Sequence, residues 1–373
     1  MNRRQSERIL GQVLSLPTAP FAEHHVLDYI RSFVAARSTV TARTDAAGNI
    51  LVHYQHGRQR VPRPICLAAH TDHPGFVAQR MLSSKKLQAL WRGGVRPQYF
   101  PGSRVRFFSE GEWVRGRITS IGTTGRGPRT TVKNAVIDVP ARVAPDSPGM
   151  WDLPEPAVRN KRIYARAIDD LAGVAAMLAC IHDIDARRQR GQAYFLFTRA
   201  EEVGFVGAMA ACKAKTIPKR CVVIAIETSS QRPHARMGDG PILRVGDKSS
   251  MFTPSATAFA GAVAEDLAQK KKRFTYQRKL MDGGTCESSA YCALGYDATG
   301  ICVALGNYHN MNVTSKRIGA EYIDLDDFAR LAEWFVALVE TRRRYNGQDP
   351  TLSRKLETLQ REFNPLLRKT ARP

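Results

Sequence analysis

Two adjacent carboxylates, Glu201 and Glu202, are the residues of this chain whose types and place most directly suggest chemistry. They follow the apolar run 193–197, which has the length and composition of a buried strand, and Gly204 and Gly207 come after them. Ligands of open α/β sheets bind beyond the carboxyl ends of the strands, so the pair is predicted to lie where catalysis is common. An isolated Glu-Glu pair is more often a solvated turn, so the interpretation depends on the other strand ends.

The ends of other predicted strands and loops carry residues of the same kind. These residues are His70, Asp72, Asp169, Glu227 and His309. Each one alone has a simpler explanation, since a buried histidine can be a core residue and an aspartate can cap a helix. Gathered at one edge of a sheet, however, the carboxylates would repel one another unless cations lay between them. Carboxylates mixed with imidazoles suit zinc, cobalt or manganese, so we expect a centre of divalent metal ions.

Alternating strands and helices must position these residues. Apolar runs predict strands at 50–54, 65–69, 193–197, 221–226 and 299–305. Helical patterns occur within 6–37 and at about 171–181, 254–272, 287–294 and 325–339. This alternation predicts an α/β fold with a mixed, mostly parallel sheet flanked by helices. Because Glu201 and Glu202 are neighbours, an extended segment would point their side chains to different sides.

The alternation of strands and helices is interrupted between about residues 75 and 163 by a segment with a different sequence pattern. Short alternating runs at 104–109, 113–121 and 134–139 are typical of half-buried strands, and the segment holds 16 Lys and Arg against 6 Asp and Glu. We therefore expect an inserted small β-barrel domain at 75–163. The catalytic domain would comprise 1–74 and 164–346, and 347–373 would form a basic amphipathic extension. The apolar stripe of this extension would be covered either by a partner or by packing back on its own domain. The stripe consists of Leu352, Leu356, Leu359, Phe363 and Leu366.

Composition limits the classes of protein that the chain can belong to. Of its 373 residues 43 % are hydrophobic, its formal net charge is +22, and its seven cysteines form no Cys-x-x-Cys pair. This favours a reducing compartment, and we expect a cytoplasmic location. No apolar run is long enough to span a bilayer, so no membrane partner is expected. Nucleic acid is not expected as the main partner, because no recognisable reading module accompanies the positive charge.

Five motifs in the chain resemble those of a known enzyme family. In order they are AHTDHPGF, ARAIDDLAG, TRAEEVGFVGA, AIETS and GNYHN. The chain resembles the co-catalytic di-zinc aminopeptidases over about residues 6–345, closest to the branch with the tetrahedral (TET), glutamyl and deblocking aminopeptidases. In that branch an extra domain separates the first histidine from the bridging aspartate, as 75–163 does here. In the related carboxypeptidase and deacylase branch the extra domain comes later in the chain.

The resemblance implies a role for each metal-ligand candidate. Asp169 would bridge two metal ions, with His70 and Glu227 completing one site and Glu202 and His309 the other. We therefore expect two divalent ions per chain, zinc first, with cobalt and manganese as alternatives.

The same resemblance implies two supporting residues and one unusual bond. Glu201 would act as the general base, and Asp72 would accept the second ring N–H of His70 and so fix its tautomer. The peptide bond between Asp169 and Asp170 would be cis, as is typical of the family.

Three positions depart from the family pattern. Glu227 stands where the family usually has Asp, Leu171 where Arg is frequent, and Cys286 where Asp ends a Gly-Gly-Thr-Asp run. The loop that contains Cys286 lies near the substrate in the family, so this change indicates altered specificity. A nucleophilic role for Cys286 is not favoured, because no histidine neighbours it in sequence and the metal centre already accounts for the chemistry.

Together these observations predict a metallo-aminopeptidase. Two metal ions would polarise the carbonyl of a peptide's first residue and activate water, and Glu201 would transfer the proton. Two alternatives remain open at this point: a di-metal amidohydrolase or deacylase acting on N-acyl amino acids, and a non-catalytic basic binding protein with a vestigial metal site. The expected partners are peptides, with acidic ones favoured by the positive charge, and further copies of the chain in a homo-oligomer.

Overall fold

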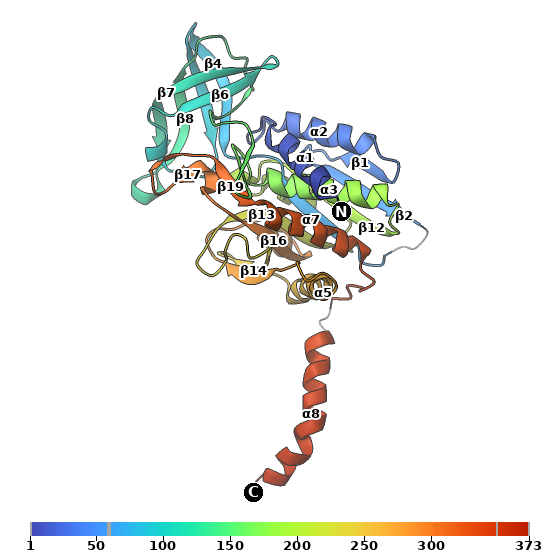
Figure 1. The fold of residues 1–373 in the computed structure, drawn as a ribbon. Helices are drawn as coiled ribbons and strands as arrows, with labels where there is room; N and C mark the ends of the chain where they lie inside the picture. Colours follow the sequence, from blue (N-terminus) through green and yellow to red (C-terminus); the bar gives the residue numbers. More distant parts are fainter. Residues whose placement is uncertain (1, 58–60, 348–349, 372–373) are drawn as a thin grey trace.

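The computed structural model describes residues 2–57, 61–347 and 350–371 of the chain. Its main body contains one eight-stranded mixed sheet with the order β1-β2-β12-β3-β13-β16-β14-β15 (Figure 1). In that order the strands are Val40–Thr44, Ile50–His56, Gly191–Thr198, Ile65–His70, Val222–Ser230, Asp297–Leu305, Ile242–Asp247 and Gln277–Met281. The central strands β12, β3, β13 and β16 run parallel, so their carboxyl ends meet at one edge. The predicted mixed, mostly parallel sheet is confirmed.

Helices cover both faces of this sheet. One face is covered by α2 (His24–Ala35), α3 (Leu171–Ala186), α5 (Pro254–Lys270) and α7 (Leu325–Glu340), with α1 (Arg3–Leu14) packed on α3 and α7, and the other face by α4 (Val206–Lys213) and α6 (Glu287–Ala293). The helix α1 buries Ile9, Leu10 and Val13 on one side, as an amphipathic surface helix does. In contrast α3 buries 13 of its 16 residues, because it packs against β3 and β13 of the sheet and also against the helices α1 and α7.

A closed antiparallel barrel is inserted after β3 (Figure 1). Its strands, in the order β4-β5-β8-β7-β6-β9, are Gly75–Ser83, Lys86–Arg92, Thr131–Asp138, Glu112–Thr124, Arg104–Ser109 and Pro148–Trp151. Aromatic side chains fill its interior, with ring centroids 4.6 Å apart for Phe76 and Trp91 and 5.2 Å apart for Phe100 and Trp151. The predicted inserted barrel is thus present.

Two small sheets connect the barrel to the main body. The strands β10 (Ala157–Arg159) and β11 (Arg162–Ala165) pair with β19 (Glu321–Asp324), which precedes α7. A second ribbon consists of β17 (Met311–Asn312) and β18 (Arg317–Ile318). We keep the division into 1–74 with 164–346, 75–163 and 347–373 as a proposal.

The last helix, α8 (Pro350–Thr370), stands clear of the main body in Figure 1. Four residues of the predicted stripe are solvent-exposed on it, with Phe363 52 % and Leu366 57 % exposed. The side chain of Leu352 lies outside the described part of the chain. The stripe therefore does not pack back on its own domain.

Two local expectations were wrong. The strand predicted at 221–226 continues to Ser230, because β13 stays paired with β16 over its whole length, so Glu227 lies inside a strand. The segment with Glu201 and Glu202 is a 3-10 turn, η3 (Glu201–Val203), and is not extended. This turn begins after Ala200, whose φ of 53° reverses the chain direction at the end of β12.

Among the described residues, no helix combines the length and apolar character needed to cross a bilayer.

Because the start of α3 is tightly packed, adding one methyl group at Gly173 should destabilise the fold. A Cβ at Gly173 would lie 2.4 Å from the Asp170 carboxylate and 2.6 Å from the Ile226 side chain. We expect Gly173→Ala to lower the free energy of unfolding by about 1–3 kcal/mol, measured by urea denaturation. Gly11→Ala in α1 is the control, since nothing lies within 4 Å of its Cβ, and it should stabilise the chain slightly. Equal effects of the two changes would contradict the packing argument.

Candidate metal centre

The carboxyl edge of the central strands brings the predicted ligands together. His70 ends β3, Asp169 precedes α3, Glu227 lies in β13, and the two neighbouring glutamates follow β12. The last predicted ligand, His309, lies in the turn η4 (Tyr308–Asn310) after β16. All of these side chains are buried. Segments far apart in the sequence thus deliver four carboxylates and two imidazoles to one place.

These side chains form two groups, each with ligand atoms within 4.8 Å of one another. The first group is His70, Glu201 and Glu227, and the second is Asp169, Glu202 and His309. Asp169 also reaches the first group, because its Oδ1 lies 3.6 Å from Nε2 of His70 while its Oδ2 lies 3.5 Å from Nε2 of His309. Its carboxylate therefore lies between the two groups, with one oxygen toward each imidazole.

The turn that holds the two glutamates is fixed by two other carboxylates. Asp72 accepts hydrogen bonds from the backbone N–H groups of Glu201 and Glu202, at 3.0 and 3.1 Å. Glu23, fully buried in the loop before α2, accepts the N–H of Ala200 at 3.0 Å. These bonds hold the turn tightly, so the adjacent glutamates can reach different groups without an extended backbone.

The ring of His70 meets Asp72 differently from the expectation. Its Nδ1 lies 3.1 Å from the backbone oxygen of Asp72 and 3.6 Å from the carboxylate, which is too far for a hydrogen bond. Nδ1 of His70 thus faces the backbone oxygen of Asp72 and not its carboxylate. The carboxylate instead accepts hydrogen bonds from the turn that holds Glu201 and Glu202.

The backbone of Asp169 is held from both sides by residues that the sequence reasoning missed. His73 Nδ1 lies 2.6 Å from its carbonyl oxygen, and the Glu321 carboxylate accepts its N–H at 3.1 Å. Asn310 contacts Nε2 of His73 at 3.0 Å through its Oδ1. His73 and Asn310 occur within the motifs AHTDHPGF and GNYHN, so the motifs contained a signal for them.

The bond between Asp169 and Asp170 is cis, as the family resemblance implied. Asp170 does not face the two groups. Its side chain accepts the N–H of Gly173 at 3.2 Å and caps α3, which leaves the carboxylate of Asp169 free for the centre.

Burial and like charge govern the titration of the carboxylates. Burial raises the pKa of Glu201 well above its ordinary value, with His70 opposing the shift and Glu227 adding to it. Burial also raises the pKa of Glu227 to about 8, and the charge of Asp169 adds to that shift. Burial would raise the pKa of Asp169 too, but the two imidazoles beside it hold that pKa well below its ordinary value. Of these three carboxylates, Asp169 is therefore the one whose ionised form its surroundings favour.

The same buried surroundings also shift the pKa values of the two imidazoles. Burial alone would lower the pKa of His70 and of His309, but the carboxylates around each ring raise it well above the ordinary value. Without cations, protons therefore supply the positive charge of the centre at neutral pH.

The residues fit divalent cations. Three buried carboxylate oxygens, Oδ1 of Asp169, Oε1 of Glu202 and Oε1 of Glu227, have no hydrogen-bond partner among the described residues. Buried polar groups are normally paired, so these lone pairs indicate a missing positive partner. Mixed carboxylate and imidazole ligands at such distances are typical of zinc, cobalt and manganese sites.

A small cavity adjoins Glu227 and contains a buried cation. Arg244, Cys286 and Tyr308 line it, together with the Gly283–Gly284 turn. The guanidinium of Arg244 is 3 % exposed, has no carboxylate within ion-pair distance in the described chain, and donates only a long 3.4 Å bond to Ser229. Burial would lower the pKa of Arg244, but neighbouring acidic groups raise it above its ordinary value, so it stays charged.

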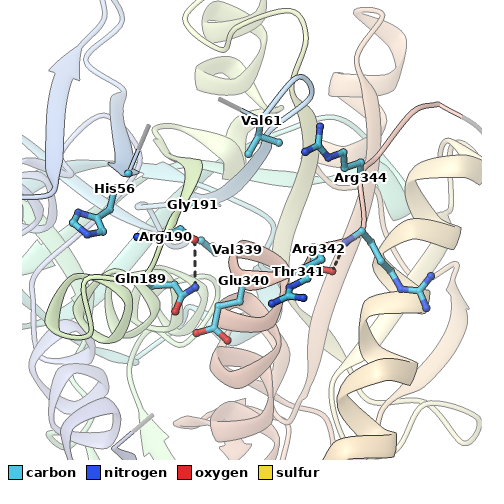
Figure 2. A pocket seen from close by; sticks show the side chains of 12 residues that line it. His56, Val61, Gln189, Arg190, Gly191, Val339, Glu340, Thr341, Arg342 and Arg344 are labelled. Atoms are coloured by element: carbon cyan, nitrogen blue, oxygen red, sulfur yellow. Dashed lines mark hydrogen bonds between the residues drawn. The ribbon is translucent and has the colours of Figure 1, made fainter. Parts of the chain in front are cut away.

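A larger cavity lies at the opposite edge of the sheet. Its volume is about 950 Å³, and it is lined by the end of β2, the start of β12 and the residues that follow α7. Figure 2 shows Arg190, Arg342 and Arg344 around it, with Glu340 on the helix side. Because β2 and β12 pair at His56 and Gly191, this cavity is at the amino end of β12, away from the two ligand groups.

Comparisons with known proteins agree with this geometry. The model of the family described as M42 glutamyl aminopeptidase matches residues 48–325. Among solved structures, an aminopeptidase from the archaeon Desulfurococcus kamchatkensis is 22 % identical, with a TM-score of 0.73 over 91 % of this chain and 95 % of its own. A TET aminopeptidase from a marine sediment archaeon of the Thaumarchaeota is 20 % identical, with a TM-score of 0.74 over 93 % and 99 %.

A third similar structure is the Pyrococcus horikoshii TET1 peptidase, which can assemble into a tetrahedron or a large octahedral shell. It is 21 % identical, with a TM-score of 0.72 over 90 % of this chain and 99 % of its own. At these identities the structures establish a shared fold.

Metal binding should release protons. At pH 7 Glu227, with a pKa of about 8, and the raised imidazoles hold protons that ligation displaces. Apparent affinity for Mn²⁺ should therefore rise between about pH 6 and 8, and the binding enthalpy in calorimetry should depend on the ionisation enthalpy of the buffer. An enthalpy independent of the buffer would contradict this prediction.

The same shift has a consequence for stability. The folded pKa of Glu227 lies above its ordinary value of 4.5, so its contribution to stability is complete below that value and is lost as the pH rises toward about 8. The melting temperature of metal-free protein should therefore fall over this range more than that of metal-loaded protein.

Proposed function

Since the chain belongs to the M42 glutamyl aminopeptidase family, we propose that it removes N-terminal residues from peptides with the help of two divalent cations. The observation that supports this most is the carboxylate of Asp169, whose two oxygens face His70 and His309 in different ligand groups. A carboxylate placed in this way suits a bridge between two ions. Family membership also favours a peptidase over a deacylase or a binding protein.

The proposed ligand sets match the second group and differ from the first in one residue, because Asp169, whose Oδ1 lies 3.6 Å from Nε2 of His70, would take the place of Glu201. Asp169, His70 and Glu227 would hold one ion, and Asp169, Glu202 and His309 the other. When bound, such ions act as Lewis acids toward a carbonyl and lower the pKa of water toward 7. The longer side chain of Glu227, where the family has Asp, is accommodated because Glu227 lies inside β13 and reaches the centre from a strand.

Glu201 would move the proton. It lies in the first group, and its backbone N–H donates to Asp72, so protein groups fix its place in the turn. Its raised pKa in the metal-free centre suits a carboxylate that takes a proton from water and passes it to the leaving amine.

The buried Arg244 supports a preference for an acidic first residue. The cavity that it lines adjoins Glu227, a proposed metal ligand, so this cavity would receive the first side chain of a peptide held at the proposed centre. A carboxylate there would supply the ionic partner that Arg244 lacks in the described chain. This local cation is a more specific cause of acidic preference than the overall charge of +22.

We also propose a homo-oligomer as the working state. Similar proteins assemble: one solved relative forms a dodecamer. The exposed apolar stripe on α8 adds a surface that a single copy leaves uncovered.

Substitutions should distinguish the roles of the two adjacent glutamates. Glu201→Gln should still bind two metal ions per chain while kcat falls about 10²–10⁴-fold, because only the base is removed. Glu202→Gln should lower the occupancy of one ion, with partial rescue of activity by excess metal. Metal analysis after dialysis tests both. Loss of metal in Glu201→Gln alone would reverse the two roles, and no effect of either change would refute the di-metal proposal.

Removing the buried cation should change substrate choice. Arg244→Met should lower kcat/KM for a glutamyl chromogenic substrate relative to a leucyl one by about 10–100-fold, the value of a charge-assisted bond. Arg244→Lys should retain part of the preference. Comparing the two substrates within each variant cancels effects on the metal centre, and an unchanged ratio would rule out this role.

The assembly is checked by light scattering. At micromolar concentration we expect a molar mass several times that of the 41.4 kDa chain. A monomer under these conditions would contradict the proposed oligomer.

A further inference from the structure

One hydrogen-bond distance connects the inserted barrel to the candidate metal centre. Nδ1 of His309 lies 3.0 Å from the carbonyl oxygen of Gly94, in the loop between β5 and β6 of the barrel. The other ring nitrogen, Nε2, faces Glu202 at 3.3 Å and Asp169 at 3.5 Å. His309 is thus held between the barrel on one side and its ligand group on the other.

We propose that the barrel completes the metal centre by positioning His309. The carbonyl of Gly94 can only accept, so it places the ring proton on Nδ1 and leaves the lone pair of Nε2 free for a cation. Such partners of ligating histidines fix the ring and its tautomer, and losing one typically weakens metal binding about 10–100-fold. This inference rests on the proposed function, and Gly94 acts as a positioning residue through His309.

The loop is fixed by the interior of the barrel. Trp91 donates its indole N–H to the carbonyl of Gly93 at 2.8 Å, and its ring is 4 % exposed. That ring packs edge-on against Phe76 and Phe100, with centroids 4.6 and 4.8 Å away. The aromatic core of the barrel therefore sets the position of the residue before Gly94.

The loop is also fitted closely to the segment that leads into the barrel. Gly93 has a φ of 117°, and a Cβ there would lie 2.7 Å from Pro74. Pro74 follows His73, which contacts the carbonyl of Asp169. The loop consequently rests on the same short segment that supports the bridging aspartate, and only glycine fits at position 93 without a shift.

A matched pair of tryptophans tests the inference. Trp91→Phe keeps an aromatic ring in the barrel core and removes the N–H that pins Gly93. Trp151→Phe is the control, because it makes the same change in the same aromatic cluster, and Nε1 of Trp151 has no hydrogen-bond partner in the part of the chain that the structure describes. Both variants of the full chain are titrated with Co²⁺, followed by the visible absorption of the bound ion, and their melting temperatures are compared.

We expect Trp91→Phe to bind one of its two Co²⁺ ions about 10–100-fold more weakly than Trp151→Phe, with the other ion unaffected. Its kcat should return to the wild-type value at excess metal, which a general loss of folding would not allow. Gly93→Ala should act in the same way. Its control, Gly111→Ala, introduces a similar positive-φ strain in a barrel turn with nothing within 4 Å of the new Cβ.

Two outcomes overturn the inference, and they are distinguishable. If wild-type protein binds two Co²⁺ ions and Trp91→Phe and Gly93→Ala titrate like their controls, the barrel does not position His309 while the proposed function stands. If wild-type protein binds no Co²⁺ at the micromolar level, the proposed function fails and this inference with it.

Discussion

Like charges held together out of water are the constraint on which this structure depends. Glu201, Glu202, Glu227 and Asp169 meet in a buried space, with two imidazoles among them and the guanidinium of Arg244 near Glu227. Such a cluster opposes folding unless positive charge enters it. The surrounding fold resists this repulsion with the largely buried α3, parallel strands paired in register and hydrogen bonds to the backbone of Asp169, Glu201 and Glu202. Much of the order at the carboxyl edge therefore holds together carboxylates that would repel one another in the absence of a cation.

Sequence patterns predicted the strands that appear in the sequence as local runs of apolar residues. Apolar runs located β3, β12 and β16, and the residues after them proved to lie at one edge because the strands are parallel. The end of β13 was wrong, since periodicity follows burial and cannot show that pairing with β16 continues through Glu227. The strands β14 and β15 were missed, because their residues are too polar to form an apolar run.

Contacts between distant segments account for most of what the sequence could not show. The hydrogen-bond partner of the His309 ring is a backbone carbonyl, so the types of side chain in the sequence do not indicate it. The carboxylate of Asp72 was expected at a ring and instead binds two backbone N–H groups of a turn that had been expected to be extended. Glu321 supports Asp169 from a strand late in the chain, and no spacing rule relates the two. In each case the missing information is the relative placement of segments, which only the assembled fold supplies.

The order in which the ligands occur along the chain has a consequence for synthesis. His70 is made early, the barrel follows, and His309 comes from the turn after β16, close to the end of the main body. A nascent chain of about two hundred residues therefore contains the whole barrel sequence but lacks Glu202, Glu227 and His309. Under the proposed assignment of ligands, a prematurely terminated copy would lack a complete metal centre and would not hydrolyse the peptides around it.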